Sequence, residues 1–448
     1  MCATCARGEL ELKKEMTLLG LIAATYFMVS GGPYGLEDLI SSTGYGLGIL
    51  ILLLVPILWA APTALMVGEL ASAIPDNGGF YVWVKRGLGN FWGFQEVWQT
   101  LASSIFDMGL YPLLFVSYLG TLAPSLTAGW HGAIIGTALV VACLLWNIRG
   151  AKAVGDGSIL FGVLMVSPFA VLTALGLWHA HHDAVVVAAQ HHAHPEFIAG
   201  ILVAMWNYMG WDNASTIAQE VENPRKTYPK AMFWTMVAIV ASYILPVVAA
   251  WRFGIPLSAW ATGSWATIGG AIAGPLIRDV IVIGGMISAA GQLNSLMMSY
   301  SRLPAAMAED GYLPKIFTHV NKAAVPLVAL FALTTVWLAA IGLSFDRMVM
   351  LDILLAGTSI VLEFVALAVL RWTEPNLPRP FEVPGGKIGA IICGILPTAL
   401  LVFAAIFCEK DGLAIGIGTI LAGFVVYWGI KAGKALRGRT TLPVLGEQ

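Results

Sequence analysis

Apolar runs about as long as a bilayer is thick recur along this chain, and no other feature constrains its fold as strongly. Hydrophobic residues make up 58% of the 448 residues and charged residues only 11%, whereas a soluble domain carries roughly 25% charged residues. A run of about 20 apolar residues spans the hydrocarbon core of a bilayer as a helix. The sequence therefore predicts an all-α integral membrane protein.

We predict twelve transmembrane helices, joined by short loops into one membrane domain with no soluble module. Their approximate limits are 17–41, 47–73, 92–122, 132–148, 155–178, 197–220, 229–251, 275–307, 325–343, 349–372, 388–408 and 413–431. No loop is long enough to hold a soluble catalytic domain, and no pattern of nucleophile and base is present, so we do not expect an enzyme.

The placement of Lys and Arg predicts the orientation. With the N-terminus inside, all but four of the 24 basic residues fall in cytoplasmic segments, and the exceptions are Arg252, Arg278, Arg347 and Lys410. The positive-inside rule then predicts that the N-terminal tail 1–16 and the C-terminal tail 432–448 are both cytoplasmic. We expect a multi-pass protein of the plasma (inner) membrane.

Charge and cysteine content exclude several other classes of function. The net charge is −2 and no basic patch is present, so nucleic acid is not an expected partner. Three of the five cysteines lie in apolar spans, and no disulfide framework emerges. Cys2 and Cys5 form a CxxC at the N-terminus without a second pair, which we interpret as part of an incidental tail rather than a metal or redox site. We expect no cofactor.

Two predicted helices contain breaks at matching depths. The first reads AATYFMVSGGPYGLEDLI, and its Gly31-Gly32-Pro33 removes side chains and one backbone donor at mid-span, so a continuous helix is not expected. The sixth reads AMWNYMGWDNASTIAQEV, with Gly210-Trp211-Asp212-Asn213 at the corresponding place. The alternative is a pair of packing kinks, because Gly and Pro are common in membrane helices.

The breaks fall in the first helix of each of two five-helix units, about 17–178 and 197–372. An odd number of helices per unit forces the two units into opposite membrane orientations, which gives an inverted repeat. Paired interrupted helices at such a repeat mark the substrate site of secondary transporters. The ten-helix core would be followed by helices 11 and 12 within 373–431.

A broken helix directs backbone groups and helix dipoles into the space between its halves. N–H groups around Ser30, Gly31 and Gly32 can hold an anion such as a carboxylate. C=O groups around Tyr208 and Gly210 can hold an ammonium group.

Four segments together resemble the amino acid–polyamine–organocation transporter superfamily, and the resemblance extends over nearly the whole chain. VSGGPYGLED is similar to the broken first helix of that superfamily, and IPDNGGFYVWVKRGLG to its first cytoplasmic loop. GWDNASTIAQEVENPRKTYPKA resembles the sixth helix and the following loop, and SRLPAAMAEDGYLPKIFTHVN the exit from helix 8. The first and third segments are most like the polyamine–proton symporter branch known from plants.

The resemblance implies a leucine-transporter-like fold of ten core helices plus two more. It also implies that Ser30, Gly31, Gly32 and Gly210 grip the amino acid backbone of a substrate, and that Trp206 closes over it. Ordinary packing or a membrane-interface position is the alternative for Trp206. The chain departs from some proton-coupled relatives, because span 155–178 lacks their buried lysine.

Asp212 lies inside the second break. A carboxylate at mid-membrane costs about 2.5–3.5 kcal/mol on insertion scales, so it is a functional candidate by default. Relatives that carry cationic amino acids place an acid near this position. We interpret Asp212 as a cation or proton site, and the alternative is a cap for the half-helix that follows it.

Polar stripes mark three other helices. Steps of three, four or seven residues place each stripe on one helix face; the members are Glu96, Gln99 or Thr100, Ser103, Asp107 and Tyr111, then Ser288, Gln292, Ser295 and Ser299, then Asp352, Ser359 and Glu363. For the serines we favour interhelical hydrogen bonding. For Asp107 and Glu363 we favour a role in a cation or proton pathway, because a bundle seldom needs a charge to hold it together.

Three further acidic residues lie near the predicted ends of helices. Glu37 and Asp38 are expected to end the first helix near the outer surface, either as a mouth that attracts cations or as an exposed helix end. Glu69 ends the second helix near the inner surface, and we interpret it as structural. The acidic groups lack basic partners in the sequence pattern, so the interior field should favour cations.

Six of the eight histidines lie in the outer loop 179–194. Such a tract can bind zinc, copper or nickel loosely, or sense pH, although a solvated variable loop is the favoured interpretation.

We therefore predict a secondary transporter that imports polyamines or amino acids across the lipid bilayer, with cationic substrates favoured and protons as the coupling ion. An amino acid exchanger of the same fold is the alternative. A metal-ion transporter that uses the histidine loop is a weaker one, because it does not explain the paired broken helices.

Overall fold

The computed structural model describes residues 14–180, 197–339, 345–406 and 410–440. Within these ranges the chain forms helices and two isolated β-bridges, with no strand. The helices are α1 (Leu18–Val29), α2 (Glu37–Val55), α3 (Ala61–Ala73), α4 (Phe80–Leu88), α5 (Asn90–Leu122), α6 (Pro124–Thr127), α7 (His131–Asn147), α8 (Ala151–Trp178), α10 (Phe197–Asn207), α11 (Pro224–Phe253), α12 (Trp265–Ala273), α13 (Pro275–Tyr300), α14 (Leu303–Glu309), α15 (Leu327–Ala339), α16 (Phe345–Thr373), α17 (Gly386–Ile406) and α18 (Lys410–Thr440).

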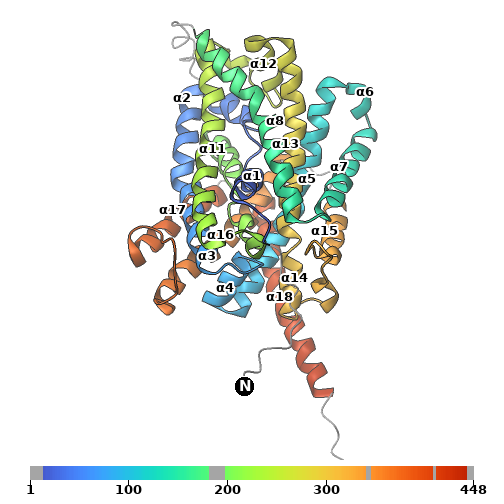
Figure 1. Cartoon of the computed structure of the whole chain (residues 1–448), viewed down its shortest axis with the longest axis vertical. Helices are drawn as coiled ribbons and strands as arrows, with labels where there is room; N and C mark the ends of the chain where they lie inside the picture. Colours follow the sequence, from blue (N-terminus) through green and yellow to red (C-terminus); the bar gives the residue numbers. More distant parts are fainter. Residues whose placement is uncertain (1–13, 181–196, 340–344, 407–409, 441–448) are drawn as a thin grey trace, which may run out of the picture.

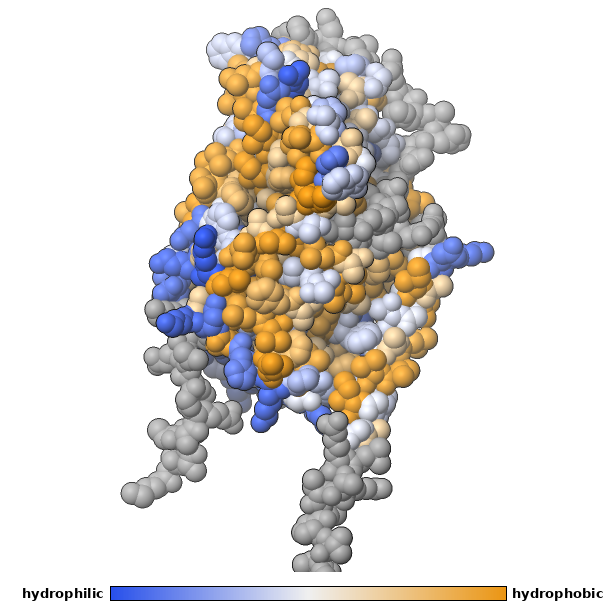
Figure 2. Space-filling view, turned by 90° about the vertical axis from the view of Figure 1, so that its right-hand side faces the viewer, coloured by the Kyte–Doolittle hydropathy of each residue, from blue (hydrophilic) through white to orange (hydrophobic). Residues whose placement is uncertain are grey.

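Membrane-length helices dominate this part of the chain. Eight helical segments are long and apolar enough to cross a bilayer, and α1, α7 and α15 are shorter apolar helices. Figure 2 shows that apolar side chains cover most of one face, with hydrophilic residues at its top, along its edges and near its bottom. Large apolar side chains exposed on this bundle, such as Leu160, Val163 and Val425, need a hydrocarbon surrounding rather than water.

The first break is present and lies where the glycines predict it. α1 begins after Thr17, whose side chain accepts the Gly20 N–H at 3.1 Å, and it ends before Ser30. The chain resumes helical geometry only at Glu37. α2 then carries the second half of the broken helix and continues through Gly44, whose φ of 75° turns the chain into the next span.

Glu37 and Asp38 therefore begin a half-helix, and the expectation that they end one is wrong. Glu37 is 1% exposed, so it is not an exposed helix end. It accepts the Gly35 N–H at 2.7 Å, which is the geometry of an acid at a helix N-terminus.

The second break separates α10 from a 3₁₀ helix, η2 (Asp212–Glu220). Gly210 has a φ of 98°, and a Cβ at this position would lie 2.4 Å from the Met28 carbonyl oxygen of α1. Only glycine fits here, because an added carbon would both strain the backbone and collide with a neighbouring helix. The two breaks consequently meet at the centre of the bundle, where Figure 1 shows α1 enclosed by other helices.

Long helices surround the two breaks. α1 packs against α8, α11 and α13, while α5 packs against both α13 and α16. α17 lies at the periphery in Figure 1, where it packs on α16 and α3. This arrangement sets the polar stripes of α5, α13 and α16 against the central breaks.

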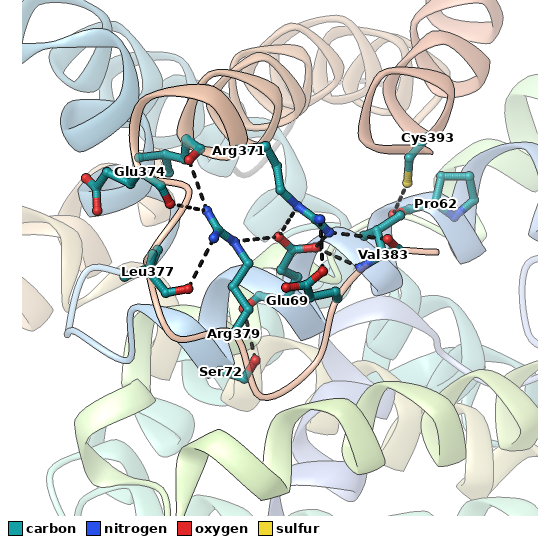
Figure 3. A network of polar contacts seen from close by, with 11 residues as sticks. Pro62, Glu69, Ser72, Arg371, Glu374, Leu377, Arg379, Val383 and Cys393 are labelled. Atoms are coloured by element: carbon teal, nitrogen blue, oxygen red, sulfur yellow. Dashed lines mark hydrogen bonds and ion pairs between the residues drawn. The ribbon is translucent and has the colours of Figure 1, made fainter. Parts of the chain in front are cut away.

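Some interior acids have basic partners, contrary to the expectation. The Glu69 carboxylate of α3 is 0% exposed and accepts from Arg371 Nε at 2.7 Å and Nη2 at 2.5 Å. It also accepts the Val383 N–H at 2.8 Å, and Arg379 Nε lies 3.2 Å away (Figure 3). A buried pair also joins Arg302 to Glu220 at 3.1 Å. The structural interpretation of Glu69 agrees with this network, which joins α3, α16 and the segment leading to α17.

Candidate substrate site

A small cavity lies where the two breaks meet. It is lined by α1, by the α10–η2 break and by the polar faces of α5, α13 and α16: Met28, Val29, Thr100, Ser103, Asp107, Tyr111, Trp206, Asn207, Met209, Gly210, Asp212, Asn213, Gln292, Leu296, Tyr300, Asp352, Ala356 and Ser359. Its volume, measured to the centre of a water-sized sphere, is about 30 Å³. That is room for roughly two waters, so a larger ligand requires the lining helices to move apart.

Four of the predicted site residues line this cavity: Trp206, Gly210, Asp212 and Asp107. Trp206 lies opposite the first break, since a Cβ at Gly35 would be 3.6 Å from the Trp206 ring. Asp107 comes from the middle of α5, and Asp212 is the first residue of η2. The other six, Ser30, Gly31, Gly32, Tyr208, Glu37 and Glu363, are not among the lining residues.

Two backbone groups of the first break already form hydrogen bonds with side chains. Ser30 Oγ accepts the Gly32 N–H at 2.9 Å, and the Gly31 carbonyl oxygen accepts the Ser288 hydroxyl at 2.7 Å. Gln292 in turn donates to Ser288 Oγ at 3.4 Å. A carboxylate at this break would therefore have to replace the Ser30 contact to reach the Gly32 N–H.

Tyr208 is directed away from the cavity. Its hydroxyl donates to the Leu52 carbonyl at 3.1 Å and its ring packs on Tyr243 with centroids 5.0 Å apart. Its carbonyl oxygen accepts the Trp211 indole N–H at 2.9 Å, so that carbonyl is occupied in this conformation.

Three carboxyl groups, Asp107, Asp212 and Asp352, face the cavity, and no lysine or arginine is among its lining residues. Asp107 accepts from the Tyr111 hydroxyl at 2.6 Å and from the Tyr300 hydroxyl at 3.0 Å. Asp352 accepts from the Ser103 hydroxyl. Each of the three is about 5% exposed or less. Buried negative charge without a basic partner attracts a cation or a proton.

Sequence reasoning assigned no site role to several lining residues. Asp352 belongs to the polar stripe on α16, and it accepts a hydrogen bond from Ser103 of α5. Asn213 is fixed by Ser299, which donates to its side-chain oxygen at 3.0 Å. The signal for Asp352 was present, because an acid in an apolar span is a functional candidate wherever it lies.

Contacts close the bundle at both ends of the cavity. Toward α12, Trp265 Nε1 donates to the Pro33 carbonyl at 2.7 Å and Tyr34 packs on both Tyr118 and Phe169. Toward α4, the Gly78 N–H donates to the Thr216 carbonyl at 3.1 Å, and Met16 forms a β-bridge with Val221. These contacts hold the helix ends together on both sides of the cavity.

In the part of the chain that the structure describes, no group of three or more His, Cys, Asp or Glu side chains could hold a metal ion. Of the histidine loop 179–194, only His179 and Ala180 are described. The remainder of that loop and the Cys2–Cys5 pair lie outside the described residues.

Comparisons with known proteins agree with this architecture. The family model for amino acid permeases matches residues 19–430. Polyamine transporter RMV1 of Arabidopsis thaliana is 32% identical over 414 residues, which cover 92% of this chain and 84% of that protein. Polyamine transporter PUT1 of Oryza sativa subsp. japonica is 32% identical over 92% of this chain and 78% of its own length.

A more distant relative is the serine/threonine exchanger SteT of Bacillus subtilis, which is 28% identical over 83% of this chain and 86% of its own length. A match of the family model across nearly the whole chain, together with helices of membrane length and a polar cavity between two helix breaks, identifies the protein class: this chain belongs to the amino acid permease family and is a multi-pass membrane transporter, not an enzyme.

Proposed function

We propose that this protein is a secondary active transporter that imports cationic small molecules, polyamines or basic amino acids, with protons as the coupling ion. The observation that carries the proposal is the set of three buried carboxyl groups, Asp107, Asp212 and Asp352, in a cavity with no basic lining residue. An ammonium group gains about 1.5–3 kcal/mol from a charge-assisted hydrogen bond to a buried carboxylate. The names of the two plant relatives support an amine substrate.

The proposed binding mode uses both helix breaks. An ammonium group would sit among Asp212, Asp107 and Asp352, beneath Trp206. The first break, Ser30 to Gly32, would receive a substrate carboxylate where the substrate has one. A polyamine lacks a carboxylate, so it leaves the Ser30–Gly32 contact intact and needs only the acids.

Transport by alternating access would move the closed ends apart in turn. We propose twelve transmembrane helices with residues 17–178 and 197–372 as inverted five-helix repeats and 373–431 as helices 11 and 12. The two broken helices, α1 with the start of α2 and α10 with η2, are the corresponding first members of each repeat. Their breaks contact each other at Met28 and Gly210, as a site at a repeat interface requires.

The orientation that we propose has both termini in the cytoplasm of a plasma-membrane protein. In a variant whose five native cysteines are replaced, a cysteine at Lys226 should react with a membrane-impermeant maleimide only after the membrane is opened. The reason is the excess of basic residues on that side. Labelling of this position in intact cells would overturn the orientation.

Uptake by the purified protein in proteoliposomes tests the function. Labelled putrescine and arginine should accumulate when an inward proton gradient is imposed, and a protonophore should abolish the accumulation. Serine serves as the uncharged comparison. Uptake of serine that depends on internal serine and ignores the proton gradient would instead favour an exchanger, which the SteT relative makes the second candidate.

A further inference from the structure

Two carboxyl side chains lie next to the substrate cavity without lining it. Glu96 of α5 and Glu363 of α16 are both 0% exposed. Glu96 Oε2 and both carboxyl oxygens of Glu363 have no hydrogen-bond partner. Buried polar groups are almost always hydrogen-bonded, so an unpartnered buried carboxyl group indicates that something else occupies or neutralises it.

Both side chains lie where α5 and α16 pack together. The Ser359 hydroxyl donates to Glu96 Oε1 at 2.8 Å. Glu363 follows Ser359 by four residues, which places it one turn away on the same helix face. Each of the two glutamates lies within electrostatic range of Asp212, and Glu363 lies within range of Glu96.

Other charged groups around the pair contact other partners or are exposed to solvent. The helices packed against α5 and α16 include α3, α4, α13, α17 and α18. Their described charged side chains are Glu69, which is bound to arginine; Lys85 and Arg86, in ion pairs with Asp310 and Glu374; Arg278 and Asp279, paired with each other; Lys387, Lys431 and Lys434, which lie over aromatic rings; and Lys410 and Asp411, which are exposed at the start of α18. No described lysine or arginine is therefore positioned to neutralise Glu96 and Glu363.

Two carboxylates in one apolar site cannot both ionise, and a proton shared between them removes the repulsion. We propose that Glu96 and Glu363 form a proton-binding site, separate from the substrate cavity, that carries the coupling proton. This inference rests on the proposed proton-coupled transport, and it adds a location for the proton outside the substrate cavity.

A hydroxyl pair connects this site to the cavity. Thr100 and Ser359 both line the cavity, and their oxygens are 3.1 Å apart. Because Ser359 also donates to Glu96, the chain from Thr100 through Ser359 to Glu96 is a continuous hydrogen-bonded route. A proton can pass along it from the cavity to the glutamate pair while the substrate remains at Asp212. No covalent chemistry is required.

The test separates proton coupling from substrate binding. Glu363→Gln and Glu96→Gln should each retain exchange of labelled putrescine between equal pools, within about threefold of the wild-type rate. Each should lose accumulation driven by a proton gradient. The double variant should be no worse than either single variant, because one shared proton is lost in each case. Glu309→Gln, a matched change at an exposed acid, should retain both activities.

Two results would overturn the proposal. One is normal gradient-driven accumulation in either single variant. The other is loss of exchange along with accumulation in a variant that elutes as a folded protein, since the pair would then belong to the substrate site or to the scaffold.

Infrared spectroscopy gives a readout that does not depend on transport. A wild-type-minus-Glu363→Gln difference spectrum should contain the C=O stretch of a protonated carboxyl group. Its absence at neutral pH would refute the proton site even if transport is proton-coupled. If the wild-type protein accumulates no amine at all, the proposed function fails, and this band still decides whether the pair holds a proton.

Discussion

Replacing Asp212 by asparagine is expected to weaken binding of putrescine by about 10- to 100-fold. The lost charge-assisted hydrogen bond is worth about 1.5–3 kcal/mol, and each 1.4 kcal/mol changes the dissociation constant tenfold. Asp212 lies at the start of η2, is 5% exposed and faces a cavity with no basic lining residue. The substitution removes the charge and keeps the shape and the capping ability of the side chain. Isothermal titration of the purified protein gives the dissociation constant directly.

The same variant distinguishes three roles for Asp212. A substrate role predicts weaker binding of putrescine and unchanged binding of an uncharged ligand. A proton role predicts normal binding and exchange with loss of gradient-driven accumulation. A purely capping role predicts wild-type values for both measurements, and this last outcome would remove Asp212 from the mechanism. Asp38→Asn is the matched control, because Asp38 is only partly buried and bonds Thr262 at the α12 end of the bundle.

Replacing Glu69 by glutamine is expected to destabilise the protein by about 3–5 kcal/mol, the range for breaking a buried ion pair. Glutamine has nearly the same shape as glutamate, so the loss of stability reflects the removed charge rather than a change in side-chain volume. Arg371 and Arg379 would be left buried without their shared counter-charge, and one of the Glu69 oxygens that accept from Arg371 and Val383 would become an amide donor. The apparent midpoint of thermal denaturation in detergent should fall by about 3–5 °C, because the unfolding entropy of a chain this long is large.

Glu374→Gln is the control for Glu69. Glu374 also binds an arginine through both oxygens, with Arg86 Nε at 2.7 Å and Nη2 at 2.6 Å, yet its side chain is 32% exposed. Exposed pairs contribute about 0.2–1 kcal/mol, so the midpoint should change little. An equal drop in both variants would contradict the role assigned to burial.

The exposed pair also has a defined pH dependence. The hydrogen bonds from Arg86 lower the pKa of Glu374 below its ordinary value. The small stabilisation from this pair is therefore present at neutral pH and is lost as the pH falls through the lowered pKa.

Local chemistry was enough to predict the class of the protein and the two breaks. An apolar run of bilayer length has to be helical, because lipid offers no partner to a backbone N–H or C=O. Gly31-Gly32-Pro33 lacks side chains and one backbone N–H donor, so a continuous helix is disfavoured there. Gly210 adopts a φ that other residues avoid. These properties belong to a few adjacent residues, so they can be read from the sequence without knowing what the helices touch.

The rotation and depth of each helix in the bundle were decided only by the tertiary structure. Periodicity places Asp352, Ser359 and Glu363 on one face of α16, but only packing against α5 brings Asp352 to Ser103 and into the cavity while it leaves Glu363 behind the cavity wall. The same applies to Glu69 and Arg371. They are about 300 positions apart in the sequence, yet Arg371 Nη2 lies 2.5 Å from Glu69 Oε2. An ion pair or a cavity depends on where two distant segments of the chain meet. Hydropathy predicts which segments cross the membrane, but it does not determine how each helix is rotated or which helices it contacts.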